Sequence, residues 1–200
     1  MSRPVSRPVT RPVTSPGALL LTPGAGADRN QHTLVAVEQA VSPLPCHRVD
    51  FPYRLAGKRA PDRAPVAVAH LVAQAAEFTA EAGVAPDRLV LGGRSYGGRM
   101  CSMAVADGLP AAGLILLSYP LHPPGKPEKL RVEHFPQLAV PVLFISGDKD
   151  PFGAPAEFAE HVGSIPGPVT QIWLPGGHDP RNADPAIAAA IVTWLAGLPQ

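Results

Sequence analysis

Short apolar runs alternate along the chain with longer segments in which apolar residues recur at helical spacing. The short runs predict strands over residues 17–21, 46–51, 89–93, 113–118, 140–146 and 169–174. The longer segments predict helices over residues 30–41, 66–82, 100–106, 155–162 and 184–195. Such alternation predicts an α/β fold, a mostly parallel sheet of about six strands with helices on both faces.

A chain of 200 residues fits one domain of ordinary size, which we place over residues 16–200. In parallel sheets of this kind, functional side chains lie in the loops that follow the carboxyl ends of the strands. Those loops are therefore where reactive residues matter most.

The turn at the end of the third predicted strand has the sequence Gly93-Arg94-Ser95-Tyr96-Gly97. A G-x-S-x-G sequence between a strand and a helix is typical of a nucleophile elbow, a sharp turn that exposes the serine. The backbone at such a turn is crowded, so the positions two residues before and after the serine favour glycine. The sequence alone also suits a plain glycine-rich turn, and the other loops must decide between these interpretations.

Two later loops contain the partners that a nucleophilic serine needs. His178 follows the last predicted strand, and Asp148 and Asp150 follow the strand before it. A histidine can accept the serine proton, and a carboxylate can orient that histidine and stabilise its charged form. The order Ser95, Asp150, His178 is the one found in α/β-hydrolases. Asp150 is favoured over Asp148 by its spacing from the preceding glycine, and Asp179 is a third candidate.

An oxyanion hole needs two backbone N–H groups close to the serine. We expect Tyr96 to supply one and Ala25, in the small-residue loop after the first strand, to supply the other. Residues in loops after other strands are candidates for the wall of a substrate pocket: Gly24, Phe51, Tyr53, Tyr119 and His122. For Phe51 and Tyr53, the alternative is ordinary packing in the core. For Tyr119 and His122, the alternative is a rigid surface loop.

Composition excludes several classes of function. The net charge of +1 argues against nucleic acid or an anionic membrane as the main partner. No apolar run reaches the length of a membrane span, and the N-terminal arginines are not followed by the apolar segment of an export signal. Cys46 and Cys101 suggest no disulfide framework, so a cytoplasmic location is expected. The metal-binding and nucleotide-binding motifs are absent, so we expect no cofactor and no metal.

Residues 1–15 repeat the unit Arg-Pro-Val-Ser/Thr. Proline at every fourth position prevents a helix and removes donors from a sheet, so the sequence predicts a disordered or polyproline-like tail. A solubilising tail is favoured here over a segment that binds a protein partner.

Six segments carry a resemblance to a known family: TPGAGA, FPY, GGRSYGGR, SYPLHPPGKPEKLR, FISGDKDPFG and PGGHD. Together they resemble the small α/β-hydrolases grouped with dienelactone-hydrolase-like proteins, relatives of testis-expressed protein 30 and of the hydrolase-like subunit of a histone acetyltransferase complex. The resemblance covers about residues 17–197. It implies a compact α/β-hydrolase fold with no large lid and without the first antiparallel strands of larger hydrolases. It also implies a Ser95, Asp150, His178 triad, with a serine where dienelactone hydrolases have a cysteine.

The motifs and the resemblance together predict a serine hydrolase that acts on a small carboxylic ester or thioester. Its partner would be a small-molecule acyl substrate. Because some members of the family serve as subunits of complexes, the alternative is a hydrolase-fold interaction subunit with little or no catalytic activity.

Overall fold

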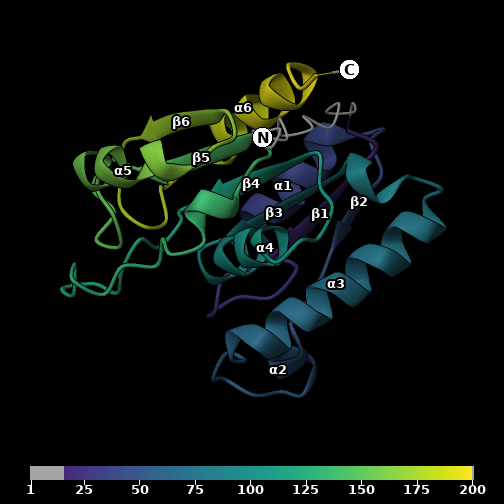
Figure 1. Cartoon of the computed structure of the whole chain (residues 1–200), viewed down its shortest axis with the longest axis horizontal. Coiled ribbons are helices and arrows are strands. Elements are labelled where there is room, and N and C mark those ends of the chain that lie inside the picture. Colours follow the sequence, from purple (N-terminus) through teal and green to yellow (C-terminus); the bar gives the residue numbers. More distant parts are fainter. Residues whose placement is uncertain (1–15, 200) are drawn as a thin grey trace, which may run out of the picture.

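The computed structural model describes residues 16–199, which contain one six-stranded sheet (Figure 1). The strand order is β2-β1-β3-β4-β5-β6, and every neighbouring pair is parallel. The strands are β1 (Ala18–Thr22), β2 (Cys46–Arg48), β3 (Leu89–Arg94), β4 (Gly113–Leu117), β5 (Val142–Gly147) and β6 (Val169–Leu174). The predicted parallel sheet is confirmed, whereas the tail predicted over residues 1–15 lies outside the described residues.

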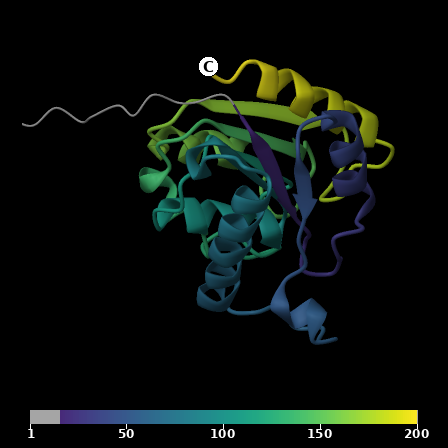
Figure 2. The same cartoon turned by 90° about the vertical axis from the view of Figure 1, so that its right-hand side faces the viewer.

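Helices cover both faces of the sheet, as the view in Figure 2 shows. They are α1 (His32–Val41), α2 (Pro52–Leu55), α3 (Ala64–Glu81), α4 (Tyr96–Ala106), α5 (Pro155–His161) and α6 (Asp184–Ala196). Within the described residues, 3₁₀ turns lie at η1 (Pro86–Arg88), η2 (Phe135–Gln137) and η3 (Val162–Ser164). None of the helices in residues 16–199 is long and apolar enough to cross a membrane.

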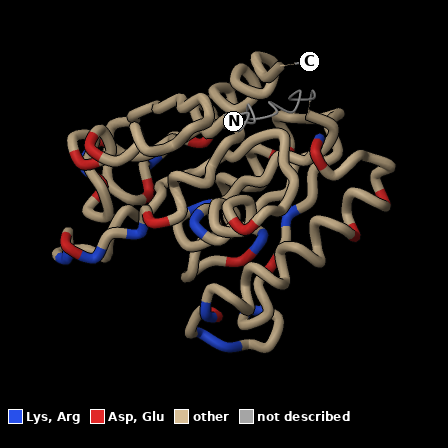
Figure 3. Tube along the Cα trace, viewed as in Figure 1, with Lys and Arg blue, Asp and Glu red and all other residues tan. Residues whose placement is uncertain are grey.

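The core consists of two clusters, one on each face of the sheet. Successive side chains of a strand point to opposite faces, so each central strand contributes to both clusters. In β4, Leu114 and Leu116 pack toward α3 and α4, while Ile115 and Leu117 pack toward α1 and α6. Charged positions are spread over the loops and the outer turns of the helices rather than gathered in one patch (Figure 3).

The structure differs from the sequence prediction at the edge of the sheet. β2 ends at Arg48 rather than at residue 51, and α2 forms directly after Phe51, where the sequence predicted no helix. β2 pairs only with β1, and Pro52 lacks the N–H that a longer ladder would need. A proline suits the first turn of a helix, so the chain turns into α2 there. The buried side chains of Phe51 and Tyr53 belong to the core on the α3 and α4 face.

The turn from β3 into α4 is the most constrained part of the backbone. Ser95 adopts φ 49° and ψ −114°, a conformation that is unfavourable for a residue with a side chain. α4 begins directly after it at Tyr96, four residues earlier than expected from the sequence. A Cβ on Gly97 would lie 2.5 Å from the carbonyl oxygen of Pro23, and a Cβ on Gly93 would overlap the end of β1. Glycine at both positions therefore lets β1, β3 and α4 meet at the serine.

We expect the substitution Gly97→Ala to destabilise the protein by about 1–3 kcal/mol, because the added methyl group forces α4 away from the end of β1. The free energy of unfolding in urea measures this effect. Gly163→Ala is the matched control, since a Cβ at Gly163 meets nothing within 4 Å. Its stability should stay within about 0.5 kcal/mol of the wild type. Equal losses in the two variants would contradict a close approach at the elbow.

Candidate active site

Ser95, Asp150 and His178 lie together in the loops at the carboxyl ends of β3, β5 and β6. His178 Nε2 is 2.9 Å from Ser95 Oγ, and His178 Nδ1 is 2.8 Å from Asp150 Oδ2. The Asp150 side chain is 1% exposed, and that of His178 is 24% exposed. A carboxylate beside Nδ1 favours the tautomer with its proton on Nδ1, which leaves Nε2 free to accept a proton from the serine. This arrangement can activate a serine hydroxyl as a nucleophile.

The other two aspartates that the sequence left open are bound elsewhere. Asp148 is exposed, and its Oδ1 accepts a hydrogen bond from the N–H of Gly176 at 2.9 Å. Asp179 is an exposed residue that forms an ion pair with Arg94 at 2.8 Å. Of the three candidates, the structure places Asp150 against the imidazole.

The loops after β5 and β6 are in direct contact, which brings the acid and the base together. The N–H of Lys149 donates to the carbonyl oxygen of Gly176 at 2.8 Å. A Cβ on Gly147 would overlap the backbone of the β6 loop, so glycine is required at the end of β5. The Phe152 ring lies 4.1 Å from the His178 ring, and the Phe152 N–H donates to Asp150 Oδ1 at 2.9 Å. Phe152 therefore contacts both residues, a role that the sequence analysis did not foresee.

Arg94 is a second residue that the sequence analysis missed. Its side chain is 8% exposed, which is unusual for an arginine. Nη2 donates to the carbonyl oxygen of His178 at 2.6 Å, and Nη1 pairs with Asp179 at 2.8 Å. The guanidinium thus fixes two consecutive residues of the loop that carries the histidine. The signal in the sequence was an arginine next to the serine, at the end of an otherwise apolar strand.

A polar cluster continues from that loop to the first turns of α1 and α6. His32 Nδ1 lies 2.6 Å from Asp184 Oδ2, and the Thr33 hydroxyl donates to Asp184 Oδ1 at 2.6 Å. Burial alone would raise the pKa of Asp184, but these two hydrogen bonds lower it below its usual value. The charged carboxylate therefore ties the two helices together behind the loop of His178.

The loop after β1 lies against the serine. A Cβ on Gly24 would be 3.6 Å from the Cβ of Ser95. The Tyr53 hydroxyl donates to the carbonyl oxygen of Ala25 at 2.8 Å and so holds this loop from the interior. Tyr96 is the first residue of α4, where a backbone N–H has no acceptor within the helix.

The four larger residues predicted for the pocket wall are buried. Phe51 and Tyr53 pack with the ring of Tyr96, so the alternative of ordinary packing describes them. Tyr119 is 0% exposed, and its hydroxyl donates a hydrogen bond to the carbonyl oxygen of Arg131. His122 is 5% exposed and its Nε2 lies 2.9 Å from Glu157 Oε1. Tyr119 and His122 therefore lie neither in an exposed pocket wall nor in a surface loop. Tyr119 packs in the aromatic cluster around Phe144, and the contact with Glu157 holds His122 inward.

Neither thiol has the environment of a nucleophile. Cys101 is fully buried beneath the elbow, with Sγ 3.4 Å from the hydroxyl of Thr22, and burial raises its pKa to about 12. Burial, with a smaller contribution from Glu38, also raises the pKa of Cys46 to about 12. Both cysteines are therefore protonated at neutral pH. Residues 16–199 contain no cluster of three His, Cys, Asp or Glu side chains arranged to hold a metal ion.

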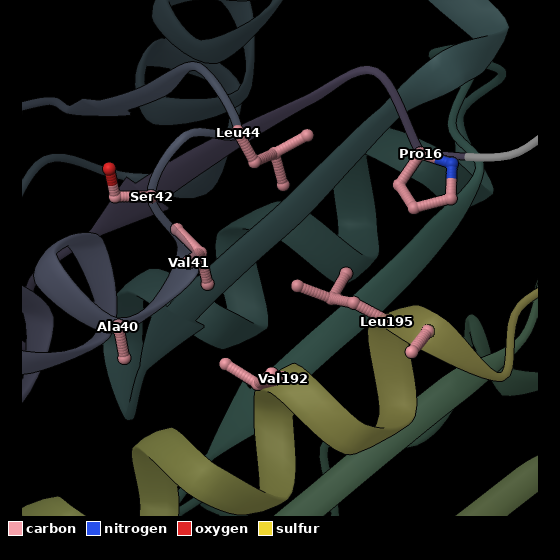
Figure 4. A pocket seen from close by; sticks show the side chains of 8 residues that line it. Pro16, Ala40, Val41, Ser42, Leu44, Val192 and Leu195 are labelled. Carbon is pink, nitrogen blue, oxygen red and sulfur yellow. The ribbon is translucent and has the colours of Figure 1, made fainter.

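An apolar hollow of about 280 Å³ lies at the other end of the sheet (Figure 4). It is bordered by the C-terminal ends of α1 and α6 and by the segment that leads into β1. Its lining residues are Pro16, Ala40, Val41, Ser42, Leu44, Val192, Leu195 and Ala196. It contains no titratable side chain and is near the amino ends of the strands, so it takes no part in the candidate site.

Comparison with known proteins gives the same fold. Est1E from Butyrivibrio proteoclasticus, with ferulic acid bound, superposes with a TM-score of 0.72 at 14% identity, over 96% of this chain and 93% of that one. Dienelactone hydrolase from Anabaena variabilis gives 0.73 at 16% identity, over 94% and 89%. A serine hydrolase homologue from Coxiella burnetii gives 0.71 at 19% identity, over 96% and 95%. The family described as "Alpha/beta hydrolase domain" matches residues 15–184. This chain therefore belongs to the α/β-hydrolase domain family.

Proposed function

We propose that this protein is a serine hydrolase that cleaves a small carboxylic ester or thioester. The observation that carries the proposal is the continuous series of contacts from Asp150 through His178 to Ser95. The presence of a dienelactone hydrolase and a serine hydrolase homologue among proteins of the same fold supports it.

In the proposed reaction, Ser95 Oγ attacks the carbonyl carbon of the substrate while His178 Nε2 takes the hydroxyl proton. Asp150 stabilises the imidazolium that forms. The tetrahedral intermediate collapses when His178 returns the proton to the alcohol or thiol that leaves. Water then attacks the acyl-serine with the same histidine as base, which releases the acid and restores the serine.

The negative charge on the tetrahedral intermediate requires donors beside Ser95. We assign them to the N–H of Tyr96, at the first position of α4, and the N–H of Ala25, in the loop that lies against the serine. Donors of this kind are each worth about 10²–10³ in rate. The hydrogen bond from Tyr53 to the carbonyl oxygen of Ala25 keeps this loop in place.

The first test is labelling of Ser95 with a fluorophosphonate probe. We expect the wild type to take the label and to hydrolyse p-nitrophenyl esters of short acids, and Ser95→Ala to lose the label and at least about 10³ of kcat/KM. Ser164→Ala is the control, because Ser164 is an exposed serine remote from the triad. A folded wild-type protein that takes no label and cleaves no ester would favour the interaction-subunit alternative.

Arg94 supplies a second test, since it positions His178 without touching the serine in any described contact. We expect Arg94→Met to lower kcat about 10- to 100-fold with a smaller effect on KM, because a displaced imidazole transfers protons poorly. Arg181→Met, at an exposed site in the same loop, should behave like the wild type. An unchanged kcat in Arg94→Met would show that the loop does not need this guanidinium.

A third test uses thiol alkylation, because Cys101 lies beneath the elbow. Because burial raises both thiol pKa values to about 12, very little thiolate is present at pH 8. Iodoacetamide should therefore leave ester hydrolysis unchanged in the native protein and alkylate both cysteines in urea. Rapid loss of activity, abolished by Cys101→Ala, would contradict the buried, protonated state assigned to Cys101.

A further inference from the structure

Arg99 lies one helical turn after Ser95 and has no acidic partner among residues 16–199. Its N–H donates to the carbonyl oxygen of Ser95 at 3.0 Å, so the two residues are about 6 Å apart along α4. The Nε atom of Arg99 is buried and makes no hydrogen bond. A buried charged donor without an acceptor is costly, so it points to an acceptor that arrives with a ligand.

A second arginine approaches from the proline-rich segment between β4 and β5, which runs along the left side of Figure 1. Tyr119 donates its hydroxyl to the carbonyl oxygen of Arg131 at 2.7 Å, and Ser102 Oγ lies 2.7 Å from His134 Nε2. These bonds fix the segment from Arg131 to His134 against α4, next to Arg99. In the described part of the chain, the Arg131 guanidinium also forms no ion pair.

The charges of the cluster act on one another, as the pKa values of its members reflect. Burial and the charge of Arg99 lower the pKa of Arg131. Burial, followed by Arg99, lowers the pKa of His134 to about 4, so this histidine is neutral at physiological pH. The carboxylates that face the cluster are Glu133 and Asp107, which act on His134 rather than pairing with either arginine. Two positive charges thus belong to one cluster, and neither forms an ion pair among residues 16–199.

We propose that Arg99 and Arg131 form an anion-binding subsite beside Ser95, and that the substrate carries a carboxylate or phosphate group in addition to the bond that is cleaved. The substrate class rests on the proposed hydrolase function, whereas the subsite rests only on the two arginines. Two guanidinium groups offer several N–H donors in a planar arrangement that matches either anion. The buried Nε of Arg99 would gain its missing acceptor when the anion binds.

The subsite is tested first without catalysis, in the Ser95→Ala variant. Inorganic phosphate and butyrate are added separately at constant ionic strength, and the melting temperature is measured. We expect at least one of the two anions to raise it, and the rise to disappear when Arg99→Met or Arg131→Met is added. Lys126→Met, an exposed cation in the same proline-rich segment, is the matched control and should retain the rise. A larger rise with one anion identifies whether carboxylate or phosphate is preferred, and no rise with either anion overturns the subsite.

The substrate class is tested with a matched pair of esters, the p-nitrophenyl monoester of succinate and its neutral methyl ester. We expect wild-type kcat/KM to be at least about tenfold higher for the anionic ester, and this ratio to fall toward one in Arg99→Met and in Arg131→Met. Lys126→Met should keep the wild-type ratio. A wild-type ratio near one, or an unchanged ratio in both arginine variants, overturns the proposed substrate class. Arginine-dependent anion binding without hydrolysis of either ester would instead overturn the hydrolase function and leave the subsite standing.

Discussion

The close approach of three backbone segments around Ser95 is the constraint on which the rest of the site depends. β1, β3 and α4 meet there with no room for side chains at Gly93 and Gly97. This crowding holds the serine in a conformation that an unrestrained chain would avoid. The same contact places the loop after β1 against the serine and starts α4 immediately behind it. The strain at one residue is thus offset by the packing of the two central strands and the helix that covers them.

The histidine reaches the serine because its loop is fixed from several sides. The loop after β5 contacts the histidine loop through backbone hydrogen bonds, and Phe152 packs on the imidazole. Arg94 donates a hydrogen bond to the carbonyl oxygen of His178. Arg94 itself is the last residue of β3, so the strand that ends in the nucleophile also positions the base. In the ion pair of Arg94 and Asp179 the guanidinium is buried but the carboxylate is exposed to solvent, so the pair orients the loop more than it stabilises the fold.

The aromatic residues near the site are buried and pack beneath its loops rather than lining its surface. Phe51 and Tyr53 pack beneath the loop that would bind the oxyanion, and Tyr119 packs beneath the segment that carries Arg131. The hydroxyl groups of both tyrosines donate to backbone carbonyl oxygens of those loops. The core on the α3 and α4 face therefore extends under both sides of the candidate site and holds its exposed loops in place.

The sequence by itself determined the order of strands and helices, the parallel sheet, and the loops in which reactive residues would lie. It could do so because burial on both faces of a sheet leaves apolar runs, and a crowded turn leaves glycines. The sequence also indicated Ser95, Asp150 and His178, since each follows a strand. Only the tertiary structure decided which aspartate faces the histidine, that Arg94 holds the histidine loop, and that the segment from Arg131 to His134 lies against α4. These contacts join residues far apart in the chain, and they depend on the conformations of individual loops. A periodic pattern of apolar residues predicts helices and strands but not loop conformations. The early end of β2 and the burial of Tyr119 have the same origin, because long-range packing overrode what the local pattern favoured.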